Sequence, residues 1–402
     1  MSTSSTSSVP SSVPSSQLAL RADELLVETI GGLFADNCTP ERLAAAEAAN
    51  GFDSALWSLL TENGLTRVGL PESIDGSGGT LHDAIAIVRA SGFHAAPVPI
   101  ADSIAAAFVC AGAGLPIPSG ALAFAILDGP ASGASHGGSV SHGSNASQGG
   151  SVSQTGNASQ SGNASHGGNA SGVGYVRVPW GGAAEHLIAV SADGVGTVAV
   201  TPEIIVGRGH NYAGEPWIDV SFAVFASPNR IVSEHVTPQP TRATAALFRS
   251  AALAGALDRT VELSIQYANE REQFGKPIGK FQILQHYLSE MAGESAATGA
   301  AVDNAVDVIS AHRGLEEAVL ASAAAKAYAG RAVATVTRLA HQLHGAIGYT
   351  DEHRLQFWTR RLWAWRDEFG SESEWAAVLG RSVAASGGAA LWPRITSWPP
   401  AR

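Results

Sequence analysis

Two short segments in the C-terminal third of the chain carry residues that could bind a diphosphate. Residues 271–282 begin Arg-Glu-Gln-Phe-Gly, and residues 342–349 read Gln-Leu-His-Gly-Ala-Ile-Gly-Tyr. A guanidinium fork together with the backbone amides of a glycine turn suits the charge and shape of a diphosphate. Taken singly, Arg271 could equally be a charge at a helix C-terminus, and Gly345 and Gly348 could be ordinary helix caps.

Both segments lie where a long helical pattern ends, so helix termini would hold them in place. Before the first segment, apolar residues four apart form one ridge of a helix of about 30 residues: Leu253, Leu257, Val261 and Ile265. Gly275 and Pro277 then stop this helix, and the second segment closes another, alanine-rich helix. We predict four long helices, over residues 241–270, 281–311, 315–343 and 351–366. Long helices with short breaks favour an antiparallel four-helix bundle over residues 239–382.

The rest of the chain predicts two further domains, and the expected fold class is α+β. Residues 17–116 show helical patterns and should form a helical N-terminal domain. Residues 117–238 contain short β-branched or apolar segments bounded by Gly, Pro and Asp, which predicts a small antiparallel β domain. Inside it, residues from about 131 to 172 are rich in Ser, Gly and Asn and cannot bury a core, so we predict a disordered insert. Residues 1–16 read as a disordered tail and residues 383–402 as a C-terminal tail.

Composition argues against several functional classes. The formal net charge is −11 with 24 Lys and Arg residues, and no basic stripe occurs, so we expect no nucleic-acid partner. No run of 18 or more apolar residues occurs, so we expect no membrane span. Residues 1–16 do not resemble a secretory signal, and Cys38 and Cys110 make no disulfide framework, so we expect a cytoplasmic protein. The histidines of the insert are irregularly spaced, and we expect no metal site.

As a pair, and with their spacing, the two motifs resemble those of the acyl-CoA dehydrogenase family. In that family, an Arg-x-x-Phe-Gly turn and a Gln-x-x-Gly-Gly-x-Gly turn reach across a dimer interface to FAD bound by the partner subunit. The resemblance implies cofactor contacts from Arg271, Gln273, Phe274, Gln342, Gly345, Ala346 and Gly348. Ala346 stands where the family has its second glycine. The resemblance spans about residues 20–382, and its motifs are specific toward the C-terminal end.

The same resemblance implies a reaction and partners. The reaction is the α,β-desaturation of an acyl-CoA-type thioester, in which a carboxylate removes the α-proton and FAD takes up a hydride. The implied electron acceptor is an electron-transferring flavoprotein. The implied assembly is a homo- or hetero-oligomer built as a dimer of dimers.

The residue that should remove the proton is missing from its expected place. The family has a glutamate, followed by glycine, beyond the glycine turn, and the ungapped count from Gly345 places Phe369 there. Some members carry the acid near the start of the first bundle helix, but residues 244–248 contain none. Glu368 and Glu372 are the nearest acids, and each could act as the base or be a solvated charge.

Three hypotheses therefore stay open. The chain could be an active homo-oligomeric enzyme with Glu368 as its base. It could be a catalytically inactive subunit of an α2β2 complex, and it resembles the base-lacking small subunit of such bacterial enzymes most. It could also be a flavin oxidase or monooxygenase on the same scaffold. Aromatic residues near the end of the bundle could pack in the core or contact a flat substrate such as a steroid: Phe357, Trp358, Trp363, Trp365 and Phe369.

Overall fold

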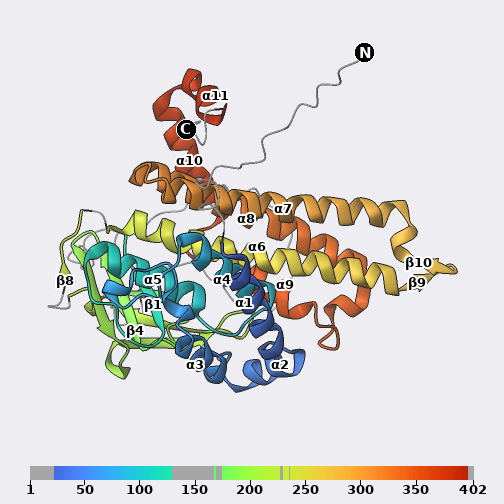
Figure 1. The fold of residues 1–402 in the computed structure, drawn as a ribbon, viewed down its shortest axis with the longest axis horizontal. Coiled ribbons are helices and arrows are strands. Elements are labelled where there is room, and N and C mark those ends of the chain that lie inside the picture. Colours follow the sequence, from blue (N-terminus) through green and yellow to red (C-terminus); the bar gives the residue numbers. More distant parts are fainter. Residues whose placement is uncertain (1–21, 129–166, 169–173, 227–229, 235, 397–402) are drawn as a thin grey trace, which may run out of the picture.

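The computed structural model describes residues 22–128, 167–168, 174–226, 230–234 and 236–396. Three long helices run along the molecule, with a short hairpin at one end and two small sheets toward the other (Figure 1). A helical region, a sheet region and a helical bundle follow one another along the chain, as the sequence predicts. The predicted tail over residues 1–16 lies outside the described residues. So does the predicted insert over residues 131–172, except that residues 167–168 form strand β2.

The N-terminal region contains five α-helices: α1 (Glu24–Asn37), α2 (Pro40–Ala49), α3 (Ser54–Glu62), α4 (Leu81–Phe93) and α5 (Ile100–Ala113). Side-chain oxygens cap the N-termini of the first four, from Asp23, Thr39, Asp53 and Thr80. Each cap accepts a hydrogen bond from a backbone N–H that the first helical turn leaves unpaired. After Thr39, Pro40 occupies the first helical position of α2, where its missing N–H costs no hydrogen bond.

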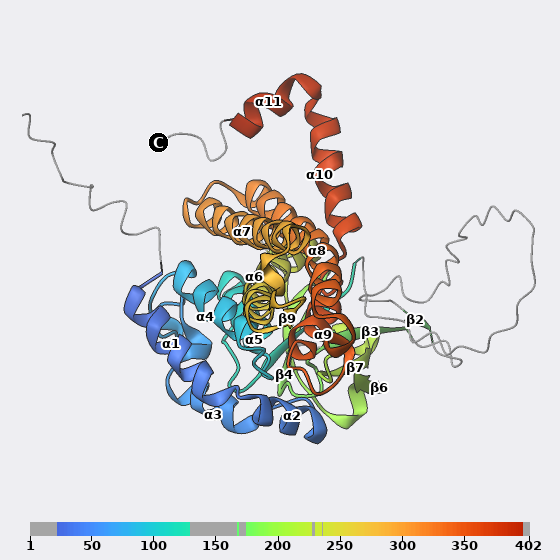
Figure 2. The same cartoon turned by 90° about the vertical axis from the view of Figure 1, so that its right-hand side faces the viewer.

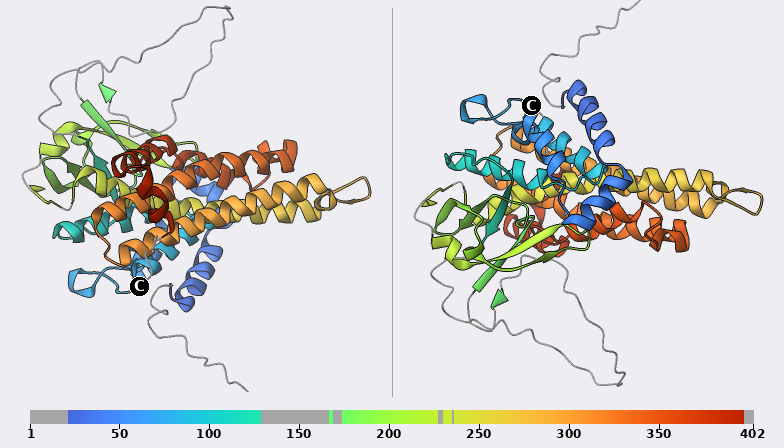
Figure 3. Two further views of the ribbon diagram at one scale, coloured as in Figure 1. Left: turned by 90° about the horizontal axis from the view of Figure 1, so that it is seen from above. Right: turned by 90° about the horizontal axis from the view of Figure 1, so that it is seen from below.

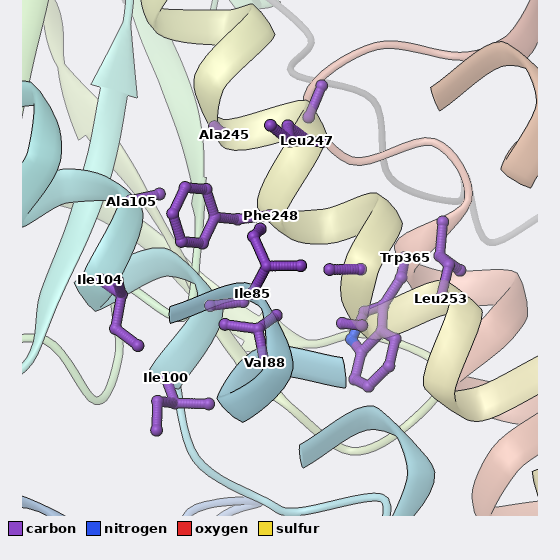
Figure 4. Packing of buried hydrophobic residues seen from close by; sticks show 14 of the residues in the cluster. Ile85, Val88, Ile100, Ile104, Ala105, Ala245, Leu247, Phe248, Leu253 and Trp365 are labelled. Carbon is purple, nitrogen blue, oxygen red and sulfur yellow. The ribbon is translucent and has the colours of Figure 1, made fainter. Parts of the chain in front are cut away.

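Helices α4 and α5 pack against the first bundle helix, α6 (Pro238–Glu270), at the centre of the main core (Figure 4). Ile85 and Val88 of α4 lie beside Phe248 of α6. The α4 and α6 backbones come close, because a Cβ added at Gly255 would lie 1.9 Å from the carbonyl oxygen of Arg89. Any side chain at this glycine would push the two helices apart.

The sheet region holds two four-stranded sheets, with strand orders β1-β4-β5-β8 and β2-β3-β7-β6. The strands are β1 (Leu122–Ile126), β2 (Gly167–Gly168), β3 (Gly174–Pro179), β4 (His186–Ser191), β5 (Gly194–Ala199), β6 (Ile205–His210), β7 (Pro216–Ser221) and β8 (Arg230–Ile231). Neighbouring strands are antiparallel except β1 and β4, which pair in parallel, so the predicted antiparallel domain is mixed at this pair. A 3₁₀ turn (Phe222–Ala226) follows β7.

The two sheets face each other, and β1 also faces the helices. Ala125 and Leu187 of one sheet pack with Val178 and Ile218 of the other. Because strand side chains alternate between faces, Phe124 of β1 points the opposite way, into the main core. Strand β1 is therefore buried on both faces, which explains its continuous apolar sequence.

The bundle consists of α6, two more long helices and two shorter ones: α7 (Gln282–Ser310), α8 (Leu315–His344), α9 (Gln356–Trp365) and α10 (Glu372–Ser386). The hairpin of β9 (Glu272–Gln273) and β10 (Lys276–Pro277), followed by a 3₁₀ turn (Ile278–Lys280), joins α6 to α7. The long predicted helices correspond closely to α6, α7 and α8. The one predicted over residues 351–366 is shorter, because it begins only at Gln356.

The chain continues as helix where a C-terminal tail is predicted. Helix α10 runs to Ser386 and α11 (Gly388–Thr396) follows, so the expectation of a tail over residues 383–402 is wrong up to Thr396. Helix α10 packs against α8, whereas α11 stands away from the body of the molecule (Figure 2). None of the helices in the described ranges combines the length and apolarity needed to cross a membrane.

Candidate functional site

A hollow of about 630 Å³ lies at the hairpin end of the bundle, where α6 and α8 end and α7 begins. Figure 3 shows this end of the molecule pointing away from the sheets. The bundle-end hollow brings together six of the seven predicted cofactor-binding residues: Arg271, Gln273, Phe274, Gln342, Gly345 and Ala346. Gly348 does not line it, because this glycine is buried behind the turn against His344 and Leu355. Two segments far apart in sequence thus share one surface.

Arg271 is the residue at which α6 ends. Its backbone N–H donates to the Tyr267 carbonyl (2.9 Å), and its own carbonyl accepts from the Ile278 N–H (2.8 Å) beyond the hairpin. These bonds fix the backbone while the side chain stays exposed. Within the described part of the chain, the guanidinium has no ion-pair or hydrogen-bond partner. The geometry leaves a cationic fork available to an anionic group.

The hairpin after Arg271 turns through two residues with left-handed backbone, Phe274 at φ 52° and Gly275 at φ 78°. Such a pair of left-handed residues matches the natural twist of a two-residue hairpin. Phe274 is 91% exposed at the tip. A phenylalanine in a left-handed conformation is strained, and strain kept at an exposed aromatic residue points to contact with another molecule.

The second turn begins at Gly345, whose backbone has φ 65° and ψ −144°. Residues with a side chain avoid this region, so the conformation requires glycine. A Cβ added there would meet no atom within 4 Å, so crowding is not the reason. Ala346 is not among the residues with positive φ, which explains why alanine can stand where the family has a second glycine.

We expect Gly345→Ala to lower the free energy of unfolding by about 1–3 kcal/mol, because alanine is strained in this conformation. Ala346→Gly is the matched control one residue away, and its cost should be about 0.5–1 kcal/mol, from backbone entropy alone. Urea denaturation followed by circular dichroism measures both values. Equal losses in the two variants would contradict the strain assigned to Gly345.

His344, the last residue of α8, carries a neutral ring beside this turn. Burial lowers the pKa of His344 to about 4. Its Nδ1–H donates to the Ala340 carbonyl (2.8 Å), which fixes the proton on Nδ1. The side chain is therefore uncharged at neutral pH, and the hollow gains no positive charge from it.

His344→Phe should make the free energy of unfolding depend less on pH in the acid range. Between pH 6.5, near the ordinary pKa of histidine, and pH 4, near its pKa in the folded chain, His344 is protonated in the unfolded chain but not in the folded chain. The contribution of His344 to stability therefore falls as the pH falls through this window. The phenylalanine variant lacks this proton uptake and should lose less stability on acidification. Unfolding free energies at several pH values test this, and parallel curves for variant and wild type would count against it.

The turn between α9 and α10 keeps the candidate bases out of the bundle-end hollow. Phe369, at the position of the family's glutamate, has a left-handed backbone (φ 59°) and a buried ring. Glu368 is 6% exposed, and its Oε2 lies 2.9 Å from Nη2 of Arg249. Glu372 lies in the first turn of α10, with its carboxylate 3.6 Å from Arg366. None of Glu368, Phe369 and Glu372 lines the bundle-end hollow.

Glu368 belongs to a network of buried charges where the three regions of the chain meet. This junction network consists of Asp102 on α5, Glu215 before β7, Arg249 on α6, Arg361 on α9, and Glu368. Nη2 of Arg249 lies 2.6 Å from Asp102 and 2.9 Å from Glu368. Nε of Arg361 lies 3.3 Å from Glu215. The Trp365 indole N–H also donates to Glu215 (2.8 Å).

Three carboxyl groups in this network share two guanidinium groups away from water. Burial raises the pKa of Glu368 to about 8 and that of Asp102 to about 6, against the attraction of Arg249. The neighbouring Glu215 carboxylate raises both values further. We did not predict this network from the sequence. The available signal was that Asp102 and Arg249 each interrupt an apolar helical run, as buried charges do.

Lys326 of α8 holds the turn that carries Glu368 and Phe369. Its fully buried ammonium donates to the carbonyls of Gly370 (2.8 Å) and Arg366. A cation at these carbonyls caps the C-terminal end of α9. Burial lowers the pKa of Lys326 to about 7. A slip of the turn that would free Glu368 from Arg249 requires these bonds to break.

The aromatic residues singled out near the end of the bundle mostly pack in the main core. Phe357, Trp358, Trp365 and Phe369 are buried there, while Trp363 is partly exposed. Core packing therefore accounts for these four residues. Among the residues that the structure describes, no group of His, Cys, Asp and Glu side chains is arranged to hold a metal ion.

Known proteins share this fold and are similar to the chain in sequence. Residues 243–372 match the family model for the acyl-CoA dehydrogenase C-terminal domain. Acyl-CoA dehydrogenase IpdE2 of Mycolicibacterium smegmatis is 26% identical over 343 residues, covering 84% of this chain and 91% of the relative. The ChsE4-ChsE5 complex from Mycobacterium tuberculosis gives a TM-score of 0.72 at 20% identity, covering 91% of this chain and 98% of that chain. The structure of PigA with FAD and proline gives a TM-score of 0.69 at 15% identity, covering 94% of this chain and 100% of that chain.

The structural likenesses establish the fold, and the sequence match covers the part of the chain that carries the site. It extends from α6 to the first residue of α10 and includes both motif turns and the turn with Phe369. Residues 243–372 match the acyl-CoA dehydrogenase C-terminal domain, and over most of its length the chain is similar in sequence to an acyl-CoA dehydrogenase.

Proposed function

We propose that this chain is the base-lacking partner subunit of a heteromeric acyl-CoA dehydrogenase and completes the FAD site of a glutamate-bearing subunit. One observation carries the proposal: the acid nearest the base position, Glu368, is held in a buried ion pair with Arg249. A general base must reach the proton that it removes. Phe369 fills the base position itself, and the other candidate, Glu372, faces Arg366.

The bundle-end hollow has the donors that FAD requires at its nucleotide end. Arg271 offers an unpaired guanidinium to the diphosphate, Gln273 and Gln342 offer amide groups, and Gly345 leaves the backbone uncovered. When bound, FAD supplies the hydride acceptor for desaturation of an acyl thioester. The hollow is lined by no acid and by no residue of the α9–α10 turn. In this proposal, the chain binds the nucleotide end of FAD and places the positive charge of Arg271 beside the diphosphate. The partner subunit provides the site where the acyl thioester reacts.

The comparisons support the same assembly. The ChsE4-ChsE5 structure is by its name a complex of two different chains, and PigA carries FAD on the same fold. The proposal includes an acyl-CoA-type thioester as substrate of the complex and an electron-transferring flavoprotein as its electron acceptor.

The flavin spectrum of the purified chain is the direct test. The proposal expects a colourless protein when the chain is purified alone, and bound FAD only after coexpression with a glutamate-bearing homologue. A chain that is yellow by itself and is bleached by acyl-CoA under anaerobic conditions would instead make it an active enzyme.

One observation favours that alternative, in which Glu368 is the base of an active enzyme. Burial raises the pKa of Glu368 to about 8, close to the range in which a carboxylate acts well as a general base at neutral pH. The raised pKa has a structural cause, however, because the same burial that produces it encloses Glu368 in the junction network.

Glu368→Gln separates the two possibilities. In the FAD-loaded complex we expect turnover within about twofold of wild type, because glutamine keeps the shape of the side chain and the partner supplies the base. Replacing the partner's base glutamate by glutamine is the control and should lower turnover by about 100-fold or more. Anaerobic reduction of the flavin by acyl-CoA measures both variants. The reverse pattern would assign the base to this chain.

A further inference from the structure

We propose that Tyr267 is the positioning residue that joins the two motif turns into one nucleotide-binding surface. This inference rests on the proposed function, because it concerns the same FAD-binding hollow. Tyr267 lines the hollow, one helical turn before Arg271, and so belongs to neither sequence motif. Its ring contacts His344 of α8, in the other motif.

The Tyr267 ring lies against the first residues of the glycine turn. It stacks on the His344 ring, with 4.5 Å between centroids and 24° between planes. Its hydroxyl donates to the His344 carbonyl at 3.4 Å. That carbonyl is the acceptor immediately before Gly345, whose backbone requires glycine. The ring therefore fixes the residue from which the glycine turn departs.

The same tyrosine anchors the arginine turn through its backbone. The Tyr267 carbonyl accepts the hydrogen bond from the Arg271 N–H (2.9 Å) that ends α6. The contact of the Tyr267 ring with His344 therefore ties the end of α6, where Arg271 lies, to the start of the glycine turn. A ligand that must contact both turns at once is sensitive to such a shift, because misplaced groups lose binding energy.

A third ring keeps the stack in place. His353 lies edge-on to Tyr267, with centroids 5.8 Å apart, and its ring centroid is 4.8 Å from that of His344. Next to it, Arg354 donates to the Gln266 side chain (2.6 Å), which ties the same loop to α6. The Tyr267 ring therefore has contacts with both His344 and His353.

Tyr267 contributes little to the main core, so its role can be tested without unfolding the chain. It packs on a small separate cluster of buried residues, Ala268, Ile278 and Leu343, at the end of the bundle. Tyr287 of α7 offers a matched control, because it is also partly buried but packs on the main core and does not line the hollow. Both tyrosine side chains are partly buried, so the two substitutions to leucine make the same chemical change in similar surroundings.

The test measures FAD affinity in the complex with the glutamate-bearing partner, by titration of the flavin-depleted complex. We expect Tyr267→Leu to raise the Kd for FAD about tenfold or more, which is the change that a loss of about 1.4 kcal/mol produces. Tyr267→Phe keeps the stack and loses a long hydrogen bond, so its Kd should stay within about threefold. Tyr287→Leu should leave the Kd unchanged. At saturating FAD, the kcat and the KM for acyl-CoA of the control variant Tyr287→Leu should also match wild type.

Two further outcomes separate the inference from the proposed function. If Arg271→Ala weakens FAD binding but Tyr267→Leu does not, the inference is overturned while the proposed function stands. If neither substitution changes the Kd, both are overturned. If Tyr267→Leu and Tyr287→Leu lose affinity for FAD to the same extent, general destabilisation explains the loss, and the positioning role is overturned.

Discussion

Arg271→Ala is expected to weaken FAD binding by the assembled complex about 100-fold. Arg271 is exposed and unpaired among the described residues, so its full donor capacity is available to a diphosphate. Hydrogen bonds to charged groups contribute about 1.5–3 kcal/mol each, and a bidentate contact supplies two of them. Equilibrium dialysis of the flavin-depleted complex against FAD measures the loss. Arg271→Lys keeps the charge but not the fork, and should recover part of the affinity.

Arg338→Ala provides the control for this prediction. Arg338 lies on α8, is also exposed, and approaches Glu290 only at 3.9 Å, outside the lining of the hollow. Its removal changes the net charge of the chain by the same amount, so it separates local contact from overall electrostatics. We expect its Kd for FAD to change by no more than about twofold. A wild-type Kd for Arg271→Ala, or equal losses in both variants, would remove the chemical basis of the proposed function.

The helices and the motif turns could be predicted from the sequence because their signals are local. The apolar spacing on α6 and the pair of Gly275 and Pro277 act over a few residues, and the helix and the turn appear where expected. The bundle-end hollow follows from them, because the ends of adjacent antiparallel helices must meet. The predicted contacts of Arg271 and Gln342 with FAD remain predictions that the experiments above test.

Other features could not be predicted because they depend on contacts between distant segments. Strand β6 has alternating half-buried and exposed residues and includes two glycines, so it lacks the β-branched pattern that marks a strand. The end of α10 and the whole of α11 lie in the C-terminal region, residues 383–402, whose prolines suggest a tail. The junction network joins Asp102 to Arg249 and Arg249 to Glu368, and no local pattern specifies which charges pair. The sequence identifies Glu368 as a candidate acid but not its partner.

Arg249→Met is expected to destabilise the chain by about 3–5 kcal/mol, because it leaves two buried carboxyl groups without their shared counter-ion. Asp102 and Glu368 both contact the same Nη2 atom, and Arg249 is fully buried. Urea unfolding of the isolated chain measures the loss. The loss should arise from unpaired charge rather than from packing, since methionine fills much of the space of the arginine stem.

The pH dependence and a triple variant distinguish these two causes of the Arg249→Met effect. Burial already raises the pKa of Glu368 and Asp102, so in the folded chain these two groups hold protons that they release on unfolding, and their contribution to stability falls as the pH rises from about 4 toward 8. Without Arg249 this fall should steepen, so that Arg249→Met is closest to wild type in mild acid and weakest near pH 8. Adding Asp102→Asn and Glu368→Gln removes both charges and should restore about half or more of the lost stability at neutral pH. If Arg249→Met loses the same free energy of unfolding at every pH, and the triple variant does not recover it, Arg249 acts only as a packing residue.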